Sequence, residues 1–314
     1  MSLPQLILGT RGSELALTQT TMVTQALQTA HPHLKIERQI IQTSGDKRQD
    51  LRFSEFSDVA QVDKGIFIKE LEIALEGRQI DAAVHSLKDV PSDLAAGFTL
   101  GAVLPRAAIE DVLITKDPHT LDSLPKGARV GTSSVRRAAQ LKFLRPDLEI
   151  VEIRGNVPTR VKKVLGENAL DAVLLAAAGL LRLGLLNANL ARIHIEEQTL
   201  CALVLDPVKF LPAAGQGAIA IECRSGDEAV IAAVQALNHA ETEARVTAER
   251  EFLKILGAGC QTPVGAHSWV KDGHLHMSVR VFNEANLSAP PVEREASRPV
   301  HEAQQLAADL AAML

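Results

Sequence analysis

The stretch LILGTRGS, Leu6 to Ser13, is an apolar run broken by glycine and hydroxyl residues, and the helix-like segment ELALTQTTMVTQAL follows it. The same plan returns at residues 128–134 as ARVGTSS, followed by VRRAAQLKFL. Each copy predicts a strand, a Gly-Thr turn and a helix whose first turn offers hydroxyls and free N–H groups. Helix starts of this kind bind anions.

A second pair of segments indicates that the chain has two related halves. QIDAAVHSLKDVP (Gln79–Pro91) and ALDAVLLAAAGL (Ala169–Leu180) each run from Ile/Leu-Asp-Ala into a short apolar strand that ends at small or polar residues. We therefore expect an α/β fold with two lobes of related construction and a ligand at the strand ends.

The pattern changes from Asn238 onward. Asn238 is a candidate N-cap with Glu241 three residues later, and we expect Gly257 to end the helix that follows. HLHMSVRVF then alternates apolar and polar residues, and HEAQQLAADLAAML predicts a closing helix, so a small α+β third domain is expected. Earlier, residues 45–65 are polar and charged without a sustained period, and we interpret them as a lid.

Composition sets limits on the class of protein. A chain of 314 residues should split into two or three domains, and 46% apolar residues can fill their cores. No apolar run is long enough to span a bilayer, and no secretion signal is visible. Three cysteines cannot pair completely and lack metal-ligand spacing, so we expect a reduced cytoplasmic protein without a metal site. The net charge of −5 argues against general nucleic-acid binding.

Basic residues gather in two places, Arg136 with Arg137, and Arg154 with Arg160 in RGNVPTR. Positive charge in the first turn of a helix opposes the macrodipole, so Arg136 and Arg137 make most sense facing an anion. Arginine forks bind carboxylate or phosphate through two hydrogen bonds. The alternative is a set of solvated surface arginines; the group as a whole favours a polyanionic ligand.

VHSLKDVP is the other dense segment, because His85, Ser86, Lys88 and Asp89 follow a strand that should be buried. A carboxylate beside a lysine there could stabilise a cationic intermediate or move a proton. A salt-bridged turn before Pro91 is an equal alternative.

Cys260, in LGAGCQTPVG, stands among small, turn-forming residues. It is either a small hydrophobe in a turn or a nucleophile or attachment point on a flexible loop. Composition does not choose between the two.

Together the motifs resemble the porphobilinogen deaminase family, whose members are also called hydroxymethylbilane synthases. The matching stretches, in the family's order, are LGTRGSELAL, KGIFIKELE, DAAVHSLKDVP, GTSSVRRAAQL, RGNVPTR, AAAGLLRLG, LPAAGQGAIAIECR and LGAGCQTPVG. The resemblance implies a transferase that condenses four porphobilinogen molecules head to tail, releases ammonia each time and yields hydroxymethylbilane. The chain would grow on a dipyrromethane cofactor bound covalently through Cys260.

The resemblance also implies roles for particular residues. Asp89 matches the family's catalytic aspartate, which stabilises the azafulvene cation left when ammonia departs. The residues implied to hold substrate or cofactor are Arg11, Ser13, Lys64, Phe67, Ser86, Lys88, Thr132, Ser134, Arg136, Arg137, Arg154, Gly155, Asn156, Arg160, Gln216 and Gly217.

Three departures from the family pattern stand out. Ala60 replaces a second lysine, Val62-Asp63 replaces a Gly-Gly pair at the end of the lid, and Pro158 stands at the expected first position of a helix, where its missing N–H is tolerated.

The fold implied is two periplasmic-binding-protein-like α/β lobes with a small C-terminal α+β domain. Lobe 1 would comprise residues 1–106 and 216–235, lobe 2 residues 107–215, and the C-terminal cofactor-attachment domain residues 236–314. A monomer is expected, with no membrane or nucleic-acid partner. The alternatives are a bilobal polycarboxylate-binding protein without catalysis, and a transferase that uses Cys260 as a nucleophile on another anionic substrate.

Overall fold

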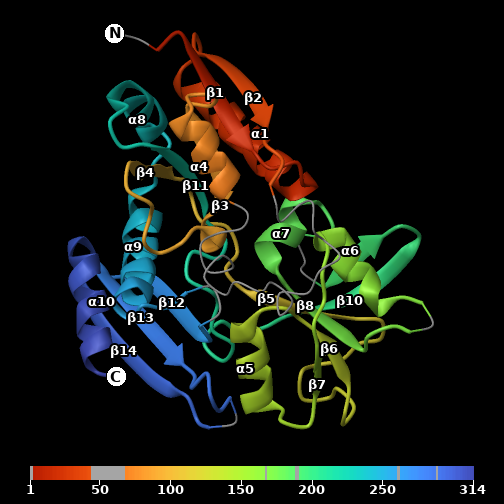
Figure 1. Cartoon of the computed structure of the whole chain (residues 1–314). Helices are drawn as coiled ribbons and strands as arrows, with labels where there is room; N and C mark the ends of the chain where they lie inside the picture. The colour runs from red at the N-terminus through yellow and green to blue at the C-terminus, as the bar shows by residue number, and fades with distance from the viewer. Residues whose placement is uncertain (1–2, 44–67, 167, 188–190, 260–261, 288) are drawn as a thin grey trace.

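The computed structural model describes residues 3–43, 68–166, 168–187, 191–259, 262–287 and 289–314. Within them the strands form three separate sheets, which Figure 1 shows as three bodies joined through the middle of the molecule. The lid expected at residues 45–65 lies outside the described residues. Among the described helices, none is both long and apolar enough to cross a membrane.

The first sheet has the strand order β2-β1-β3-β11-β4. Its strands are β1 (Gln5–Thr10), β2 (Lys35–Ile40), β3 (Ala82–Ser86), β4 (Phe98–Val103) and β11 (Ile219–Arg224). β1 runs parallel to β2 and β3, whereas β11 runs antiparallel to β3 and β4. The chain thus returns to this sheet after passing through the second one.

Helices cover both faces of the first sheet because its strand side chains alternate. Leu6 and Leu8 of β1 share a core with α1 (Glu14–Ala30) and α8 (Glu228–Gln235). Ile7, between them, faces the opposite way and packs with α4 (Lys69–Glu76). The strand and helix expected from LILGTRGS and the residues after it are therefore confirmed.

The second sheet has the order β7-β6-β8-β5-β10-β9. Its strands are β5 (Asp111–Thr115), β6 (Arg129–Gly131), β7 (Glu149–Val151), β8 (Ala172–Ala176), β9 (Arg192–Ile195) and β10 (Gln198–Val204). Its helices are α5 (Val135–Leu144), α6 (Val157–Val161) and α7 (Ala177–Arg182), with a 3-10 turn at Lys162–Val164. The strand predicted from ARVGTSS, the helix after it and the short apolar strand predicted within Ala169–Leu180 are confirmed.

The two lobes repeat one arrangement down to single hydrogen bonds. β6 lies between β7 and β8, parallel to both, as β1 lies between β2 and β3. The Asp81 carboxylate accepts a hydrogen bond from the Ile7 N–H at 2.8 Å, and Asp171 accepts one from the Arg129 N–H at 2.7 Å. These aspartates are the Asp of the repeated Ile/Leu-Asp-Ala segments, so the sequence repeat reflects a structural one.

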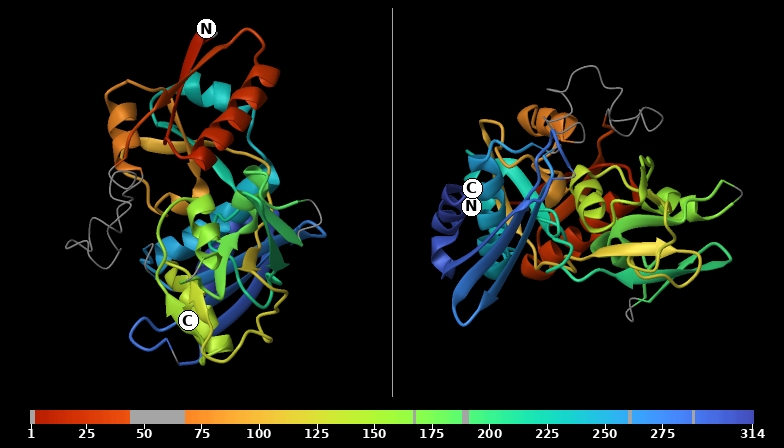
Figure 2. Two further views of the ribbon diagram at one scale, coloured as in Figure 1. Left: turned by 90° about the vertical axis from the view of Figure 1, so that its right-hand side faces the viewer. Right: turned by 90° about the horizontal axis from the view of Figure 1, so that it is seen from below.

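The third sheet is an antiparallel meander of β12 (Val264–Lys271), β13 (His274–Val281) and β14 (Val292–Pro299). α9 (Ala240–Ile255) and α10 (Ala303–Ala312), the latter after a 3-10 turn at Val300–Glu302, pack against it. Figure 2 shows this blue unit beside both lobes without extending either sheet. The expected α+β third domain and its closing helix are confirmed.

The start of α9 corrects one prediction. The N-cap is His239, whose Nδ1 accepts a hydrogen bond from the Thr242 N–H at 3.2 Å, and not Asn238. The Asn238 amide is engaged elsewhere: it accepts from the Val103 N–H and donates to Glu243. Gly257 ends the helix as predicted, with a φ of 61° that suits glycine.

Two chain segments connect the lobes and run side by side. The Ala107 N–H donates to the Gly217 carbonyl at 3.1 Å, and a Cβ on Gly217 would lie 2.6 Å from the Ala107 oxygen. Arg106 donates to both carboxylate oxygens of Glu249 on α9, at 2.7 and 2.9 Å, and from Nε to the Gln216 carbonyl. The third domain is thereby anchored to both connections.

Candidate functional site

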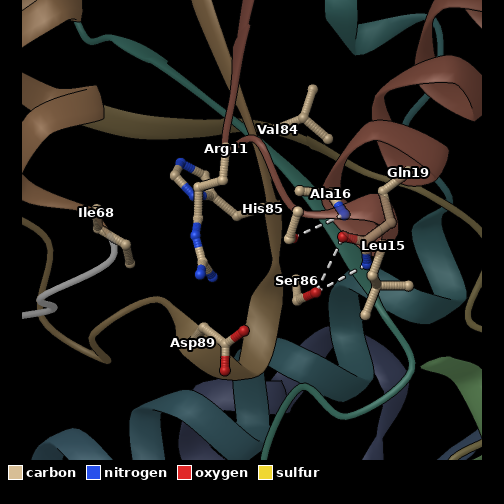
Figure 3. Close-up of a pocket in the computed structure, with 10 residues that line it drawn as sticks. Arg11, Leu15, Ala16, Gln19, Ile68, Val84, His85, Ser86 and Asp89 are labelled. Carbon is tan, nitrogen blue, oxygen red and sulfur yellow. Dashed lines mark hydrogen bonds between the residues drawn. The ribbon is translucent and has the colours of Figure 1, made fainter. Parts of the chain in front are cut away.

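A pocket opens in lobe 1 between the start of α1 and the end of β3, with a volume of about 420 Å³ that includes open solvent. We call it the Asp89 pocket. It is lined by Arg11, Ser13, Leu15, Ala16, Gln19, Ile68, Val84, His85, Ser86 and Asp89. Figure 3 shows the Arg11 side chain extending into it on the side where Asp89 lies.

The turn after β1 places the first helix at this pocket. Ser13 is the N-cap of α1, and its Oγ accepts a hydrogen bond from the Ala16 N–H at 3.3 Å. The hydroxyl is therefore engaged with the helix, while the positive end of the helix dipole points to the pocket. Arg11 precedes it and lines the same space.

The end of β3 supplies the acidic group. A 3-10 turn at Leu87–Asp89 follows the strand, burying Leu87 and leaving Asp89 exposed. Within the described part of the chain the Asp89 carboxylate forms no ion pair, so the alternative of a Lys88–Asp89 salt-bridged turn is wrong for these residues. Ser86 is held by the Gln19 amide, with contacts of 2.8 and 3.1 Å (Figure 3).

A buried pair supports the strand beneath Asp89. Nε2 of His85 lies 3.0 Å from Oε2 of Glu222 on the neighbouring strand β11, and both side chains are almost completely buried. His85 therefore lies in the strand rather than after it, and it links β3 to β11 at the wall of the pocket.

Arg136 and Arg137 lie in the first turn of α5, as predicted, but they are neither solvated nor free. Both are buried, with 3% and 6% of their surface exposed. Arg136 Nη1 lies 2.8 Å from Oδ2 of Asp111, and Arg137 donates to Oδ1 of Asp111 from Nε and Nη2 at 3.0 and 2.6 Å. The anion that these arginines face in the structure is Asp111.

The Asp111 carboxylate is held ionised. Burial alone would raise its pKa, but the charges of Arg136 and Arg137 and their hydrogen bonds outweigh burial and lower the pKa far below its ordinary value. Because one carboxylate faces two guanidiniums, an excess of positive charge remains in this part of lobe 2.

Gln216 joins this cluster to the residues of lobe 1. Its Nε2 donates to Asp111 Oδ1 at 3.0 Å and to the Ile109 carbonyl at 2.7 Å, while its Oε1 accepts from Lys88 Nζ at 3.5 Å. Burial, and then repulsion by Arg137, lower the pKa of Lys88 to about 8, although Asp89 and Asp111 counteract this shift. Lys88 therefore connects the Asp89 pocket with the arginines of lobe 2.

The RGNVPTR segment brings a further arginine to the same region. Asn156 caps α6 by accepting from the Thr159 N–H at 2.9 Å, and Arg160 Nε donates to the Gly155 carbonyl at 2.7 Å. Burial, then Arg137, lower the pKa of Arg160 to about 10, and Asp89 opposes the shift. Pro158 occupies the second position of α6, not the first, because the helix begins at Val157.

The structure brings most of the expected site residues together. Those at the Asp89 pocket or in the charge network across the lobes are Arg11, Ser13, Ser86, Lys88, Asp89, Arg136, Arg137, Arg160 and Gln216. Thr132, Ser134, Gly155 and Asn156 shape the helix starts beside them, Arg154 lies close enough to lower the pKa of Arg160, and Gly217 lies in the lobe connection.

Several expectations lie outside the described residues. They concern Lys64, Phe67, Cys260, Ala60 and the Val62-Asp63 pair. On either side of Cys260, the Thr262 N–H donates to the Gly259 carbonyl at 3.1 Å and the Gly259 N–H to Thr262 Oγ1 at 3.2 Å. Cys201 and Cys223 are free thiols, and burial raises the pKa of Cys223 to about 12.

Sequence reasoning missed Asp111, Gln19 and Arg182. Arg182, in the last turn of α7, donates from Nη2 to the Gly217 carbonyl at 2.8 Å, and burial lowers its pKa to about 10. Asp111 was detectable only as an acidic residue opening an apolar strand, and Gln19 only as a polar residue on the buried side of α1. Among the described residues no cluster of His, Cys, Asp and Glu is suited to a metal ion.

This arrangement suits a ligand with several carboxylates. Arg11, Lys88 and Arg160 contribute positive charge from both lobes, and the exposed Asp89 lies among them. A fixed carboxylate in such a place can accept N–H hydrogen bonds and stabilise a cation that forms beside it.

Two of the comparisons with known proteins identify one family. "Porphobilinogen deaminase, dipyromethane cofactor binding domain" matches residues 6–232, and "Porphobilinogen deaminase, C-terminal domain" matches residues 243–314. The porphobilinogen deaminase of Desulforamulus reducens is 41% identical over 99% of this chain and 94% of its own length. That of Roseiflexus sp. is 48% identical over 83% of this chain and 80% of its own length. Among solved structures, the methionine-binding protein MetQ aligns with 79% of this chain and 96% of its own at 14% identity and a TM-score of 0.45.

Proposed function

Because the chain belongs to the porphobilinogen deaminase family, we propose that its Asp89 pocket and the basic residues around it hold the substrate while Asp89 assists the loss of ammonia. The activity itself is the stepwise head-to-tail condensation of four porphobilinogen molecules on a dipyrromethane cofactor, with release of ammonia and then hydroxymethylbilane. The relatives do not favour a binding protein without catalysis.

The acidic side chains of the pyrrole rings are the first feature to be recognised. Each ring carries an acetate and a propionate, so the growing chain is a polyanion. The residues proposed to hold it are Arg11, Ser13, Lys64, Phe67, Ser86, Lys88, Thr132, Ser134, Arg136, Arg137, Arg154, Gly155, Asn156, Arg160, Gln216 and Gly217. Because Asp111 neutralises one of its two arginines, the remaining positive charge supports carboxylate binding.

The observation that carries the proposal is the position of Asp89. It is exposed in the pocket that Arg11 lines, and its charge acts on Lys88 of lobe 1 and Arg160 of lobe 2. When the C–N bond of porphobilinogen breaks, the electron pair leaves with the nitrogen of the protonated aminomethyl group as ammonia, and the carbon skeleton becomes a cation that extends over the pyrrole. The Asp89 carboxylate can accept the pyrrole N–H and stabilise that charge.

The donors present fit the cofactor as they fit the substrate. A dipyrromethane also carries acetate and propionate groups, which need hydrogen-bond donors. In the described part of the chain, the guanidiniums of Arg136 and Arg182 each retain a buried Nε without a hydrogen-bond partner. When bound, the dipyrromethane supplies the pyrrole carbon to which the first ring is joined. We propose Cys260, which follows α9 in the sequence, as its attachment point.

The denatured intact mass of the purified protein tests the attachment. The wild-type protein should exceed its polypeptide mass by two porphobilinogen units less two ammonia molecules, and Cys260→Ala should have the bare mass. Cys201→Ala, which removes a half-buried free thiol in lobe 2, is the matched control and should keep the excess. Loss of the excess from Cys201→Ala but not from Cys260→Ala would overturn the assignment.

The finer organisation is also proposed. We assign residues 1–106 and 216–235 to lobe 1, 107–215 to lobe 2 and 236–314 to the cofactor-attachment domain; the place of β11 between β3 and β4 supports the discontinuous first lobe. We further propose a cytoplasmic monomer that does not bind nucleic acid, which the net charge of −5 supports.

A further inference from the structure

Arg250 of α9 holds the chain segment that immediately follows Asp89. Its Nη1 donates to the Val90 carbonyl at 2.9 Å, and its Nη2 donates to the Pro91 carbonyl at 2.7 Å and the Ser92 carbonyl at 3.3 Å. Three successive carbonyls of lobe 1 thus converge on one side chain of the third domain. In Figure 1 α9 lies next to the turn that follows β3.

Val90 is buried in a core beside Val246 of α9, but few backbone hydrogen bonds among the described residues fix the segment. The Val90 N–H closes the 3-10 turn by donating to the Leu87 carbonyl, and Pro91 has no N–H to donate. The carbonyls of a segment that leaves a strand need partners when they turn inward. Arg250 supplies them, so the direction in which the chain leaves Asp89 depends on this guanidinium.

The guanidinium has no carboxylate partner within ion-pair distance among the described residues. It is largely buried, and burial lowers its pKa to about 10, with the charge of Glu222 opposing the shift. A buried cation that is solvated mainly by backbone carbonyls keeps those carbonyls in place, because releasing them would leave the charge unsatisfied. One turn further along α9, Lys254 adds an exposed ion pair to Asp93 at 2.9 Å.

We propose that Arg250 is a positioning residue for Asp89: by clamping the carbonyls of residues 90–92 to α9, it fixes the turn that presents the carboxylate to the substrate. It acts through the backbone and does not touch substrate. The inference rests on the proposed role of Asp89. Misplacement of a reacting group by about 1 Å can cost about 100-fold in rate, so loss of the clamp should affect turnover more than binding.

Arg245 provides a matched control on the same helix. Its Nη2 donates to the Ser268 carbonyl at 2.7 Å, so it also makes a bond from a guanidinium to a carbonyl, but inside the third domain. Replacing either arginine by glutamine removes one largely buried cation from α9. Only Arg250→Gln releases the segment beyond Asp89.

The experiment measures kcat, KM and thermal unfolding for cofactor-loaded Arg250→Gln, Arg250→Lys, Arg245→Gln and Asp89→Asn, with loading checked by intact mass. For Arg250→Gln we expect kcat to fall about tenfold or more with KM within about threefold of wild type. Arg250→Lys keeps the charge but lacks the planar fork of the guanidinium. Its kcat should therefore lie between those of wild type and Arg250→Gln. Arg245→Gln should keep its kcat within about twofold even if its unfolding temperature falls equally.

A wild-type kcat in the folded Arg250 variants would overturn the inference, as would an equal loss of kcat in Arg245→Gln. If Arg250→Gln does not fold, Arg250→Lys decides alone, since a lower kcat at unchanged KM supports the clamp and a wild-type kcat refutes it. If Asp89→Asn retains turnover, the role of Asp89 itself fails. If Asp89→Asn is inactive and the Arg250 variants are normal, only the role of Arg250 fails.

Discussion

The guanidinium of Arg137 donates two hydrogen bonds to Oδ1 of Asp111, from Nε at 3.0 Å and from Nη2 at 2.6 Å. The second carboxylate oxygen lies 2.8 Å from Arg136, and Gln216 donates to the first. One buried carboxylate therefore orients two arginines and the glutamine that reaches Lys88.

Asp111→Asn should destabilise the fold strongly. Breaking a buried ion pair from one side typically costs about 3–5 kcal/mol, because it leaves an uncompensated buried charge, and here two guanidiniums would be left. Denaturant unfolding measures the change. Asp147→Asn breaks the more exposed Arg145–Asp147 pair and should have a much smaller effect. Equal stability of both variants and wild type would contradict the assigned role of Asp111.

Lys88 should make substrate capture depend on pH. Its pKa of about 8 means that it is charged below this pH and loses its proton above it. We therefore expect kcat/KM to fall as pH rises through about 8, since a neutral Lys88 attracts the substrate carboxylates less. Arg stays protonated throughout, so Lys88→Arg should remove this step.

The ratio of the two proteins' kcat/KM values across neutral and alkaline pH cancels the titration of the substrate itself. A ratio that stays constant through the alkaline range would show that Lys88 does not titrate in the free enzyme, and the charge network would need another explanation.

Gly155→Ala should impair both stability and binding. Gly155 has a φ of 105°, and a Cβ there would lie 2.7 Å from Cγ2 of Thr159. We expect a loss of about 1–3 kcal/mol from the strained backbone, together with a raised KM, because the Gly155 carbonyl holds Arg160. Gly166→Ala is the control: its φ is 93°, but apart from its chain neighbours no described residue has a heavy atom within 4 Å of the added Cβ. If Gly166→Ala raises KM as much, the Arg160 contact is not the cause.

Local patterns predicted much of the fold. The two strand-turn-helix copies became β1 with α1 and β6 with α5, and the Asp of each Ile/Leu-Asp-Ala segment bonds the equivalent strand in its lobe. These features follow from alternation, caps and turns within a few residues. Asn238 shows the limit, since its amide is taken by Val103 and Glu243, and His239 caps the helix instead.

Contacts between distant segments could not be predicted in the same way. Asp111 opens β5, and Arg136 lies on α5, which follows β6. The two residues meet because β5 and β6 are the two neighbours of β8 in the sheet, and no short-range pattern specifies that strand order. The arginines were expected to face an anion, but the sequence did not indicate that a side chain of the protein provides one. The role of Arg250 could not be predicted from the sequence, because its partners are backbone carbonyls about 160 residues away. Every residue has such a carbonyl, so the side chains at those positions do not indicate the contact.

Ammonia release by cofactor-loaded Asp89→Asn tests the central claim most directly. The substitution keeps the size of the side chain and removes its charge, and Asp89 is exposed, so the fold and the loaded mass should persist. In a single turnover with porphobilinogen we expect release to slow by about 100-fold or more, with binding largely retained. Release at close to the wild-type rate from a correctly loaded Asp89→Asn protein would contradict the role assigned to this carboxylate.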